Sequence, residues 1–288
     1  MTAPPQGVEV DHVQFPAGRI RFHRAGSAGP AVVLLHGGGL SNGLVAWRST
    51  IPVLAEDHRV FVPDLPKQGA SQPWHGRANQ RNLEEVLRWL LDHWEIKQAV
   101  LLGHSIGGSV ATGFALRHPE RVQGLVLADS EGLQARVDKH PLRYALTRAG
   151  FPGSVGAKLV GTNKGVAKQV LVHHILTGSR PVTDLDAIAE EVREEAKQRS
   201  TLLTEWETDS LGPRGTTTNH LPRLGQLRCP TMLIHGEKDA IVPLASSQAA
   251  ATALPQARLR VVRDTGHWPN RERPNEFNAF VREFVNNH

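Results

Sequence analysis

Hydrophobic residues along the first half of the chain follow two alternating patterns. The segment "AVVLLHG", residues 31–37, is continuously apolar, which suits a central strand covered on both faces. Later segments alternate between short strand-like runs and amphipathic stretches with apolar residues every three or four positions. The predicted strands span 59–65, 98–105 and 122–129, and the predicted helices span 47–56, 81–94 and 107–119. Regular alternation of this kind predicts a mostly parallel sheet with helices on both faces.

The two ends of the chain complete this pattern. Residues 8–16 and 18–26 alternate polar and apolar side chains, which predicts an antiparallel hairpin that turns at Ala17 and Gly18. Near the other end we predict strands at 231–239 and 257–264, followed by a helix at 273–288, with another helix between the two strands.

The alternation stops between Ser130 and Leu224. This stretch is polar, rich in charge and helix formers, and has no convincing strand. Its charge-rich segment 187–198, "AIAEEVREEAKQ", is interpreted as a helix with a solvated charged face and some apolar positions turned toward the pocket. We therefore predict an α/β core made of residues 1–129 and 225–288, with a helical cap at 130–224 inserted over the strand ends, where such folds bind ligands.

A serine between glycines follows the strand predicted at 98–105. Gly103, Ser105 and Gly107 form the pattern G-x-S-x-G between a strand and a helix. In that setting the serine lies on a sharp turn, its hydroxyl is exposed above the sheet, and the glycines prevent collisions. We predict that Ser105 is a nucleophile; an idle serine in a glycine-rich turn is the alternative.

A serine hydroxyl needs a base and an orienting acid. Asp239 and His267 each end a later predicted strand, so the chain order is serine, aspartate, histidine, as in hydrolases with this motif. Asp129, which also ends a strand, is the rival for the acid. We predict Asp239, because the next strand leads to His267.

The glycines after the strand at 31–37 predict an oxyanion hole. Successive glycines let backbone N–H groups approach a developing negative charge. We assign Gly38 and Ile106 as the donors, with Gly39 as the alternative to Gly38. His36 is interpreted as a structural hydrogen-bonding residue.

Composition narrows the class of partner. The chain has 33 basic and 28 acidic residues, and the basic residues are interspersed with acidic ones rather than clustered. Aromatic residues make up only 5% of the chain, so a surface that binds nucleic acid is not expected. The single cysteine, Cys229, cannot form an internal disulfide, and neighbouring histidines such as His173 and His174 lack metal-ligand spacing. We expect a cytoplasmic protein that acts on a small molecule without metal, cofactor or membrane, with a homo-oligomer as an option.

The motifs together resemble the α/β-hydrolase family over nearly the whole chain apart from the cap. The matching segments are "LLHGGG", "DLPKQGAS", "GHSIGG", "HGEKDAIVP" and "DTGHW". The resemblance implies that Ser105 attacks a carbonyl, His267 transfers the proton, and Asp239 orients His267. Water then releases the acyl group.

Within the family, four features look like the hydrolases that split carbon–carbon bonds in ring-cleavage products: "HGGG", the cap, "GHW", and "EFNAFVREFV". Three positions depart from those enzymes. The chain has "GLS" in place of G-P-G, His104 in place of asparagine, and Glu190, with Arg193 nearby, where the cap arginine is expected.

Our main prediction is therefore hydrolysis of a carboxylic ester or lactone. Cleavage of a carbon–carbon bond in a vinylogous diketone and a noncatalytic role as ligand receptor or pathway component are the alternatives. Peracid formation is a further option on the same scaffold. We also predict that His104, Trp268 and Gly39 contact the substrate.

Overall fold

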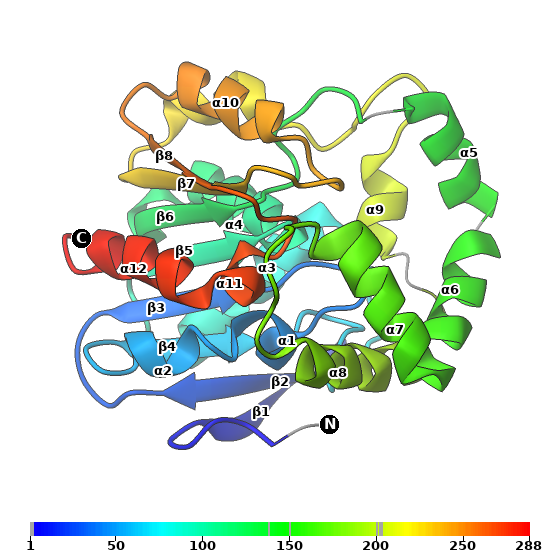
Figure 1. Ribbon diagram of the computed structural model, residues 1–288. Coiled ribbons are helices and arrows are strands. Elements are labelled where there is room, and N and C mark those ends of the chain that lie inside the picture. Colours follow the sequence, from blue (N-terminus) through cyan, green and yellow to red (C-terminus); the bar gives the residue numbers. More distant parts are fainter. Residues whose placement is uncertain (1–2, 138, 150, 200, 202–203) are drawn as a thin grey trace.

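A computed structural model describes residues 3–137, 139–149, 151–199, 201 and 204–288. Its centre is an eight-stranded sheet in the order β1-β2-β4-β3-β5-β6-β7-β8 (Figure 1). The strands are β1 (Glu9–Phe15), β2 (Gly18–Ala25), β3 (Ala31–Leu35), β4 (Arg59–Pro63), β5 (Ala99–His104), β6 (Val122–Ala128), β7 (Thr231–Gly236) and β8 (Arg258–Val262). The first two pair as an antiparallel hairpin, β2 is antiparallel to β4, and all other pairs are parallel. The predicted α/β-hydrolase fold is confirmed.

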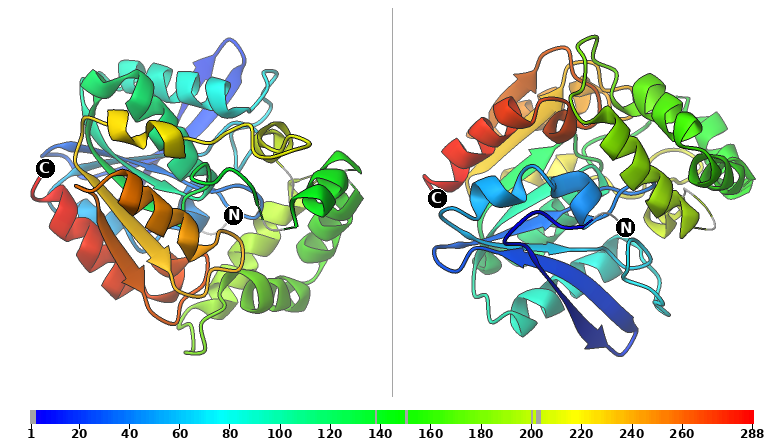
Figure 2. Two further views of the ribbon diagram at one scale, coloured as in Figure 1. Left: turned by 90° about the horizontal axis from the view of Figure 1, so that it is seen from above. Right: turned by 60° about the horizontal axis from the view of Figure 1, so that its bottom comes forward.

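Helices cover both faces of the sheet because successive strand side chains point to opposite faces. Val33 of β3 belongs to the apolar cluster on one face, which includes side chains of α3 (Gln80–His93), α4 (Ile106–Arg117) and α10 (Leu244–Ala253). The adjacent Leu34 belongs to the cluster on the other face, which includes side chains of α1 (Gly43–Trp47), α2 (Ile51–Leu54) and α12 (Pro274–Val285). The two layers are visible in Figure 2.

One predicted helix is two helices in the structure. The segment 47–56 was expected to be continuous, but α1 ends at Trp47 and α2 begins at Ile51. Asn42 caps α1 by accepting the N–H of Val45, which starts the helix earlier than the apolar pattern indicated. Pro52 lies in the first turn of α2, the position where a missing backbone N–H costs no helical hydrogen bond.

The inserted segment forms helices on one side of the sheet, at the right in Figure 1. They are α5 (His140–Ala149), α6 (Phe151–Thr162), α7 (Lys164–Val170), the π-helical turn η2 (Leu171–Ile175), α8 (Leu185–Lys197) and α9 (Glu205–Ser210). The 3-10 turn η3 (Leu221–Gln226) returns the chain to the core, and α11 (Pro269–Glu272) follows β8. Among its described residues the segment has no strand, only an isolated bridge between Leu211 and Thr216. The exact cap boundaries at 130 and 224 stay a prediction.

Helix α8 corrects one expectation. Its charged face was interpreted as solvated, with some apolar positions facing the pocket, but two of its glutamates are buried against the core. Glu191 binds Arg48 at 2.5 Å and Arg271 at 3.0 Å, and Glu195 accepts from Asn42 at 2.8 Å. Apolar residues such as Ile188 pack inside the cap. The charge pattern alone could not show this, because the partners come from distant parts of the chain.

Candidate active site

Ser105 lies at a strained corner between β5 and α4. Its φ of 53° and ψ of −120° are rare for a residue with a side chain, and it makes no side-chain capping bond to the helix it starts. A Cβ atom on Gly103 would collide with the backbone of Gly107, and one on Gly107 would collide with the carbonyl of Leu35. The glycines are therefore required by close backbone approach, as the motif predicted.

His267 and Asp239 form a direct pair. Nδ1 of His267 donates to Oδ2 of Asp239 at 2.7 Å, although 28 positions separate them in the chain. Oδ1 of Asp239 accepts the N–H groups of Ile241 at 2.7 Å and Val242 at 3.0 Å. These contacts hold the carboxylate toward the imidazole, and Asp239 occupies only the Nδ1 side of the ring.

The electrostatics of Asp239 suit an orienting acid. Burial acts to raise its pKa, but attraction to His267 and hydrogen bonds with His235 and His267 outweigh burial. The pKa of Asp239 is therefore held well below its usual range, so this carboxyl is ionised near neutral pH.

Hydrogen bonds hold the serine corner against the end of β6 and against the loop that carries His267. The N–H of Ser105 donates to Ala128 at 3.0 Å, and its carbonyl accepts the N–H of Glu131 at 3.1 Å. Nε2 of the adjacent His104 donates to the backbone carbonyl of His267 at 2.7 Å. The cap contributes as well, because the carbonyl of Ile175 accepts the N–H of His267 at 2.7 Å.

The glycine loop after β3 lies against the start of α4. A Cβ on Gly38 would collide with the Ile106 side chain and come within 3.0 Å of Thr204 in the cap. Gly39 has a φ of +64°, a conformation that glycine adopts without strain. The assignment of the Gly38 and Ile106 N–H groups as oxyanion donors stays a prediction, with Gly39 as the alternative.

His36 has the structural role that the sequence indicated. Its Nε2 accepts the N–H of Leu65 at 2.9 Å and its Nδ1 donates to Gly37 at 2.6 Å. Burial lowers the pKa of His36 to about 4, so the ring is neutral at ordinary pH. It joins the loop after β3 to the loop after β4.

His104 and Trp268, which we predict to contact the substrate, are both buried in the structure. His104 is buried with its ring centroid 4.8 Å from that of His267, and burial lowers its pKa to about 3. Trp268 packs in the apolar cluster that joins the cap to the core. Contact of these residues, or of Gly39, with substrate stays a prediction.

Two cavities lie between the core and the cap. The larger, about 580 Å³, is lined by Ile106, Thr204 and Trp206 together with Gln68 and Arg199. The smaller, about 200 Å³, also contacts Trp206 and is lined by charged side chains of Glu131, Arg143 and Glu207. The residue after the serine therefore faces a space of ligand size.

Sequence reasoning missed several of these wall residues. Thr204 and Glu207 make reciprocal capping bonds at the start of α9, and the T-x-x-E pattern in the sequence was the available signal for that helix. No comparable signal marked Glu131 or Arg143. Both reach the cavity only because the cap folds back over the loop after β6.

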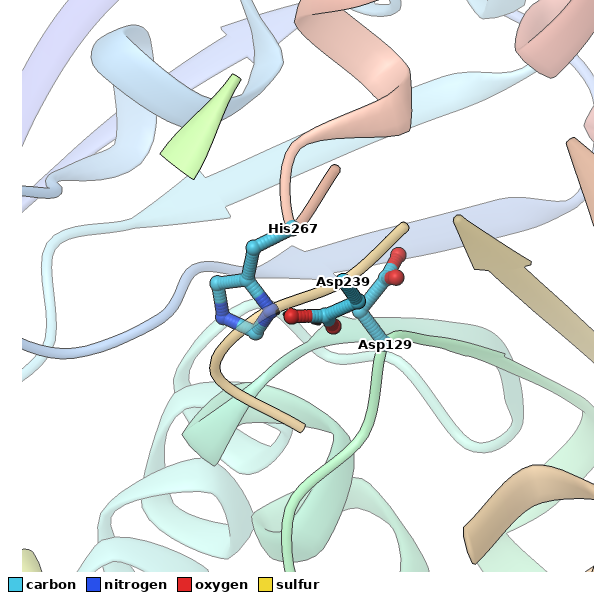
Figure 3. Close-up of side chains that lie close together, drawn as sticks. All are labelled: Asp129, Asp239 and His267. Atoms are coloured by element: carbon cyan, nitrogen blue, oxygen red, sulfur yellow. Dashed lines mark hydrogen bonds and ion pairs between the residues drawn. The ribbon is translucent and has the colours of Figure 1, made fainter. Parts of the chain in front are cut away.

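The acid, its rival and the base form the one group of candidate metal ligands found among the described residues (Figure 3). Their donor atoms, from Asp129, Asp239 and His267, lie within 4.8 Å of one another. Nδ1 of His267 is already engaged by Asp239, so the arrangement is that of a hydrogen-bonded pair with a second carboxyl beside it.

In the part of the chain that the structure describes, no helix is long and apolar enough to cross a bilayer.

A family model described as "alpha/beta hydrolase fold" matches residues 30–274. The chain belongs to the α/β-hydrolase family. The match includes Ser105, Asp239 and His267, and it bears out the resemblance that the sequence motifs indicated.

Several relatives and solved structures are similar to this chain over nearly their whole length. A 2-hydroxymuconate semialdehyde hydrolase from Pseudomonas sp. (strain CF600) is 31% identical over 295 residues, which covers 99% of this chain and 97% of the relative. The structure of a 2-hydroxy-6-oxo-6-phenylhexa-2,4-dienoate hydrolase from Rhodococcus sp. strain RHA1 is similar with a TM-score of 0.78 and 26% identity, covering 97% and 99% of the two chains. A thermophilic esterase from Thermogutta terrifontis is similar with a TM-score of 0.75 and 25% identity, covering 97% and 98%.

Proposed function

We propose that the protein is a serine-dependent hydrolase that cleaves a carbon–carbon bond next to a carbonyl group in a vinylogous diketone. The observation that carries the proposal is the end-to-end similarity to a hydrolase named for 2-hydroxymuconate semialdehyde. This choice reverses the order of the two sequence-based alternatives, because the main prediction was an ester or lactone. No cofactor is needed, and we expect the protein to act in the cytoplasm.

In the proposed mechanism Oγ of Ser105 adds to the carbonyl carbon while Nε2 of His267 accepts the hydroxyl proton. Asp239 stabilises the imidazolium that results, since it already accepts from Nδ1 at 2.7 Å. The N–H groups of Gly38 and Ile106 bind the oxyanion. Collapse of the intermediate breaks the bond to the leaving carbon, which takes the proton back from His267, and water then hydrolyses the acyl-serine by the same path.

Hydrolysis of a carboxylic ester or lactone is the second candidate, and one feature of the cap favours it. The resemblance to carbon–carbon hydrolases expects an arginine where this chain has Glu190, and the neighbouring Arg193 is engaged by Glu190 at 3.0 Å on a half-buried face of α8. A substrate that carries no carboxylate does not need that arginine. Both candidates use the same three catalytic side chains.

The test compares wild type and Ser105→Ala on two substrates, a vinylogous diketone acid followed by loss of its visible absorbance and a short-chain p-nitrophenyl ester. We expect wild type to turn over the diketone with the higher kcat/KM. A higher kcat/KM on the ester would favour the second candidate. Equal rates for the two proteins on both substrates would refute serine catalysis, and saturable binding without turnover would indicate a receptor.

A further inference from the structure

Asp129 is a buried carboxyl with no role in the mechanism above. It directly follows β6, has a φ of 45°, and its side chain is 0% exposed. Its Oδ1 accepts the N–H of Gly236 at 2.9 Å. Its Oδ2 receives no hydrogen bond from the residues that the structure describes. An ionised oxygen buried without a donor is costly, whereas a protonated oxygen needs only an acceptor.

Such an acceptor lies beside it. In Figure 3 the carboxyl of Asp129 lies next to that of Asp239, which in turn contacts His267. Asp239 receives donors on both oxygens, from Ile241, Val242 and His267, while Asp129 receives one backbone donor. If the two carboxyls hold one proton between them, the proton belongs on Asp129, since Asp239 has the greater number of donors to stabilise a negative charge.

The other titratable groups near the pair do not remove the need for that proton. Nε2 of His235 lies 3.7 Å from Asp129 and 3.5 Å from Asp239, and it donates to the carbonyl of Val242 at 3.0 Å. Nδ1 of His235 lies 2.7 Å from the Ser247 hydroxyl, so each ring nitrogen has a partner other than the two carboxyls. Glu272 adds further negative charge in the neighbourhood. Burial and the charge of Asp239 raise the pKa of Asp129 well above its usual range, although the hydrogen bond from Gly236 acts to lower it.

We infer that Asp129 is a positioning residue that stays protonated through turnover and donates a hydrogen bond from Oδ2 to Asp239. This keeps one negative charge, rather than two, behind His267 and holds the Asp239 carboxylate in place. The inference rests on the proposed triad for its effect on catalysis, but the protonation of Asp129 is independent of which substrate the protein uses.

The catalytic test compares two variants of the same residue. Asp129→Val removes the donor, and we expect kcat to fall about 10- to 100-fold with little change in KM, because a hydrogen bond to a charged group is lost. Asp129→Asn restores an N–H donor and should recover most of that loss, with the acid limb of the kcat/KM profile within about 0.3 pH unit of wild type. An acid limb that moves about one unit lower in Asp129→Asn would mean that wild-type Asp129 is ionised, which overturns the inference.

A second measurement works without activity and without the valine variant. The infrared difference spectrum between wild type and Asp129→Asn at pH 7 reports the carboxyl that the substitution removes. We expect wild type to show the C=O band of a protonated carboxylic acid that the variant lacks. A carboxylate band in its place would overturn the inference. If neither protein turns over any substrate while the acid band is present, the proposed function fails and the protonation of Asp129 stands.

Discussion

The sheet and the outer helices of the cap differ in how completely they bury their apolar side chains. In the sheet Leu34 is 0% exposed, whereas Leu142 on α5 is 55% exposed and Leu159 on α6 is 53% exposed. Among the described residues of α5, only His140 is buried. Hydrophobic burial therefore stabilises the strands that lead to Ser105, Asp239 and His267, and it contributes little at these outer positions of the cap.

Helix α8 shows a third situation within the cap. It combines an apolar face inside the cap with two buried glutamates bonded to core residues. Because Glu191 is paired with Arg48 and Arg271, loss of this glutamate leaves buried positive charge uncompensated. The comparison indicates that α8 attaches the cap to the core through buried ion pairs, whereas α5 has only one buried side chain among its described residues.

The largest expected effect concerns the edge of the sheet where the proposed catalytic residues lie. Ser105→Ala should lower kcat by about 10³- to 10⁶-fold, since no other group can take the place of the nucleophile. Unfolding in urea should remain close to wild type, because the hydroxyl makes no capping bond. Labelling by a fluorophosphonate checks the assignment directly. Equal labelling of both proteins would place the reactive hydroxyl elsewhere.

The attachment of α8 is tested by two adjacent glutamates. Glu191→Ala leaves the buried Arg271 without its 3.0 Å partner and should lower the free energy of unfolding by about 3–5 kcal/mol. Glu190→Ala is the matched control. It removes a contact at the half-buried face with Arg193 and should cost at most about 1 kcal/mol. Similar losses in urea unfolding for the two variants would contradict the distinction.

Substitution of one leucine in the sheet and one in the outer cap tests how much each region depends on hydrophobic burial. Leu34→Ala should destabilise the protein by about 2–5 kcal/mol, because the substitution leaves a cavity in a fully buried layer. Leu159→Ala, at 53% exposure, should change stability by about 0.5 kcal/mol or less. A large effect of Leu159→Ala in thermal or urea unfolding would show that a partner or a second copy covers this face of α6.

The pH dependence of stability should reflect the neutral histidines of the core. The pKa of His36 falls from 6.5 to about 4 on burial, so between these values the unfolded chain binds a proton that the folded chain does not. Its contribution is therefore fully present above pH 6.5 and decreases as pH falls toward 4, by about 1.4 kcal/mol per pH unit.

The measurement is urea unfolding of wild type and His36→Gln at pH 6.5 and pH 5. Wild type should lose about 2 kcal/mol more than the variant over this interval. The difference between the two proteins isolates His36 from buried carboxyls such as Glu131, whose raised pKa acts in the opposite direction. Equal losses of unfolding free energy in wild type and His36→Gln would show that His36 gains a proton in the folded state.

Much of the fold and the strained turn at Ser105 could be predicted because the signals are local. The apolar run at 31–35 and the G-x-S-x-G turn each act within a few residues, and the structure has a strand and a strained serine there. The prediction of one helix at 47–56 was wrong, because two local features outweighed the apolar pattern. The Asn42 side chain caps α1 by accepting a hydrogen bond from Val45, and a proline lies in the first turn of α2. The solvated face expected of α8 was wrong at Glu191 and Glu195, whose partners lie far away in the chain.

The sequence by itself determined the order of strands and helices, the sharp turn at Ser105 and the pairing of an acid with a base after later strands. These follow from backbone sterics and hydrophobic periodicity, which act over short distances along the chain. Only the tertiary structure decided that Asp239 rather than Asp129 bonds to His267, and that Glu131 and Trp206 line cavities beneath the cap. Contacts of that kind depend on distances in space between segments whose separation along the chain carries no such information.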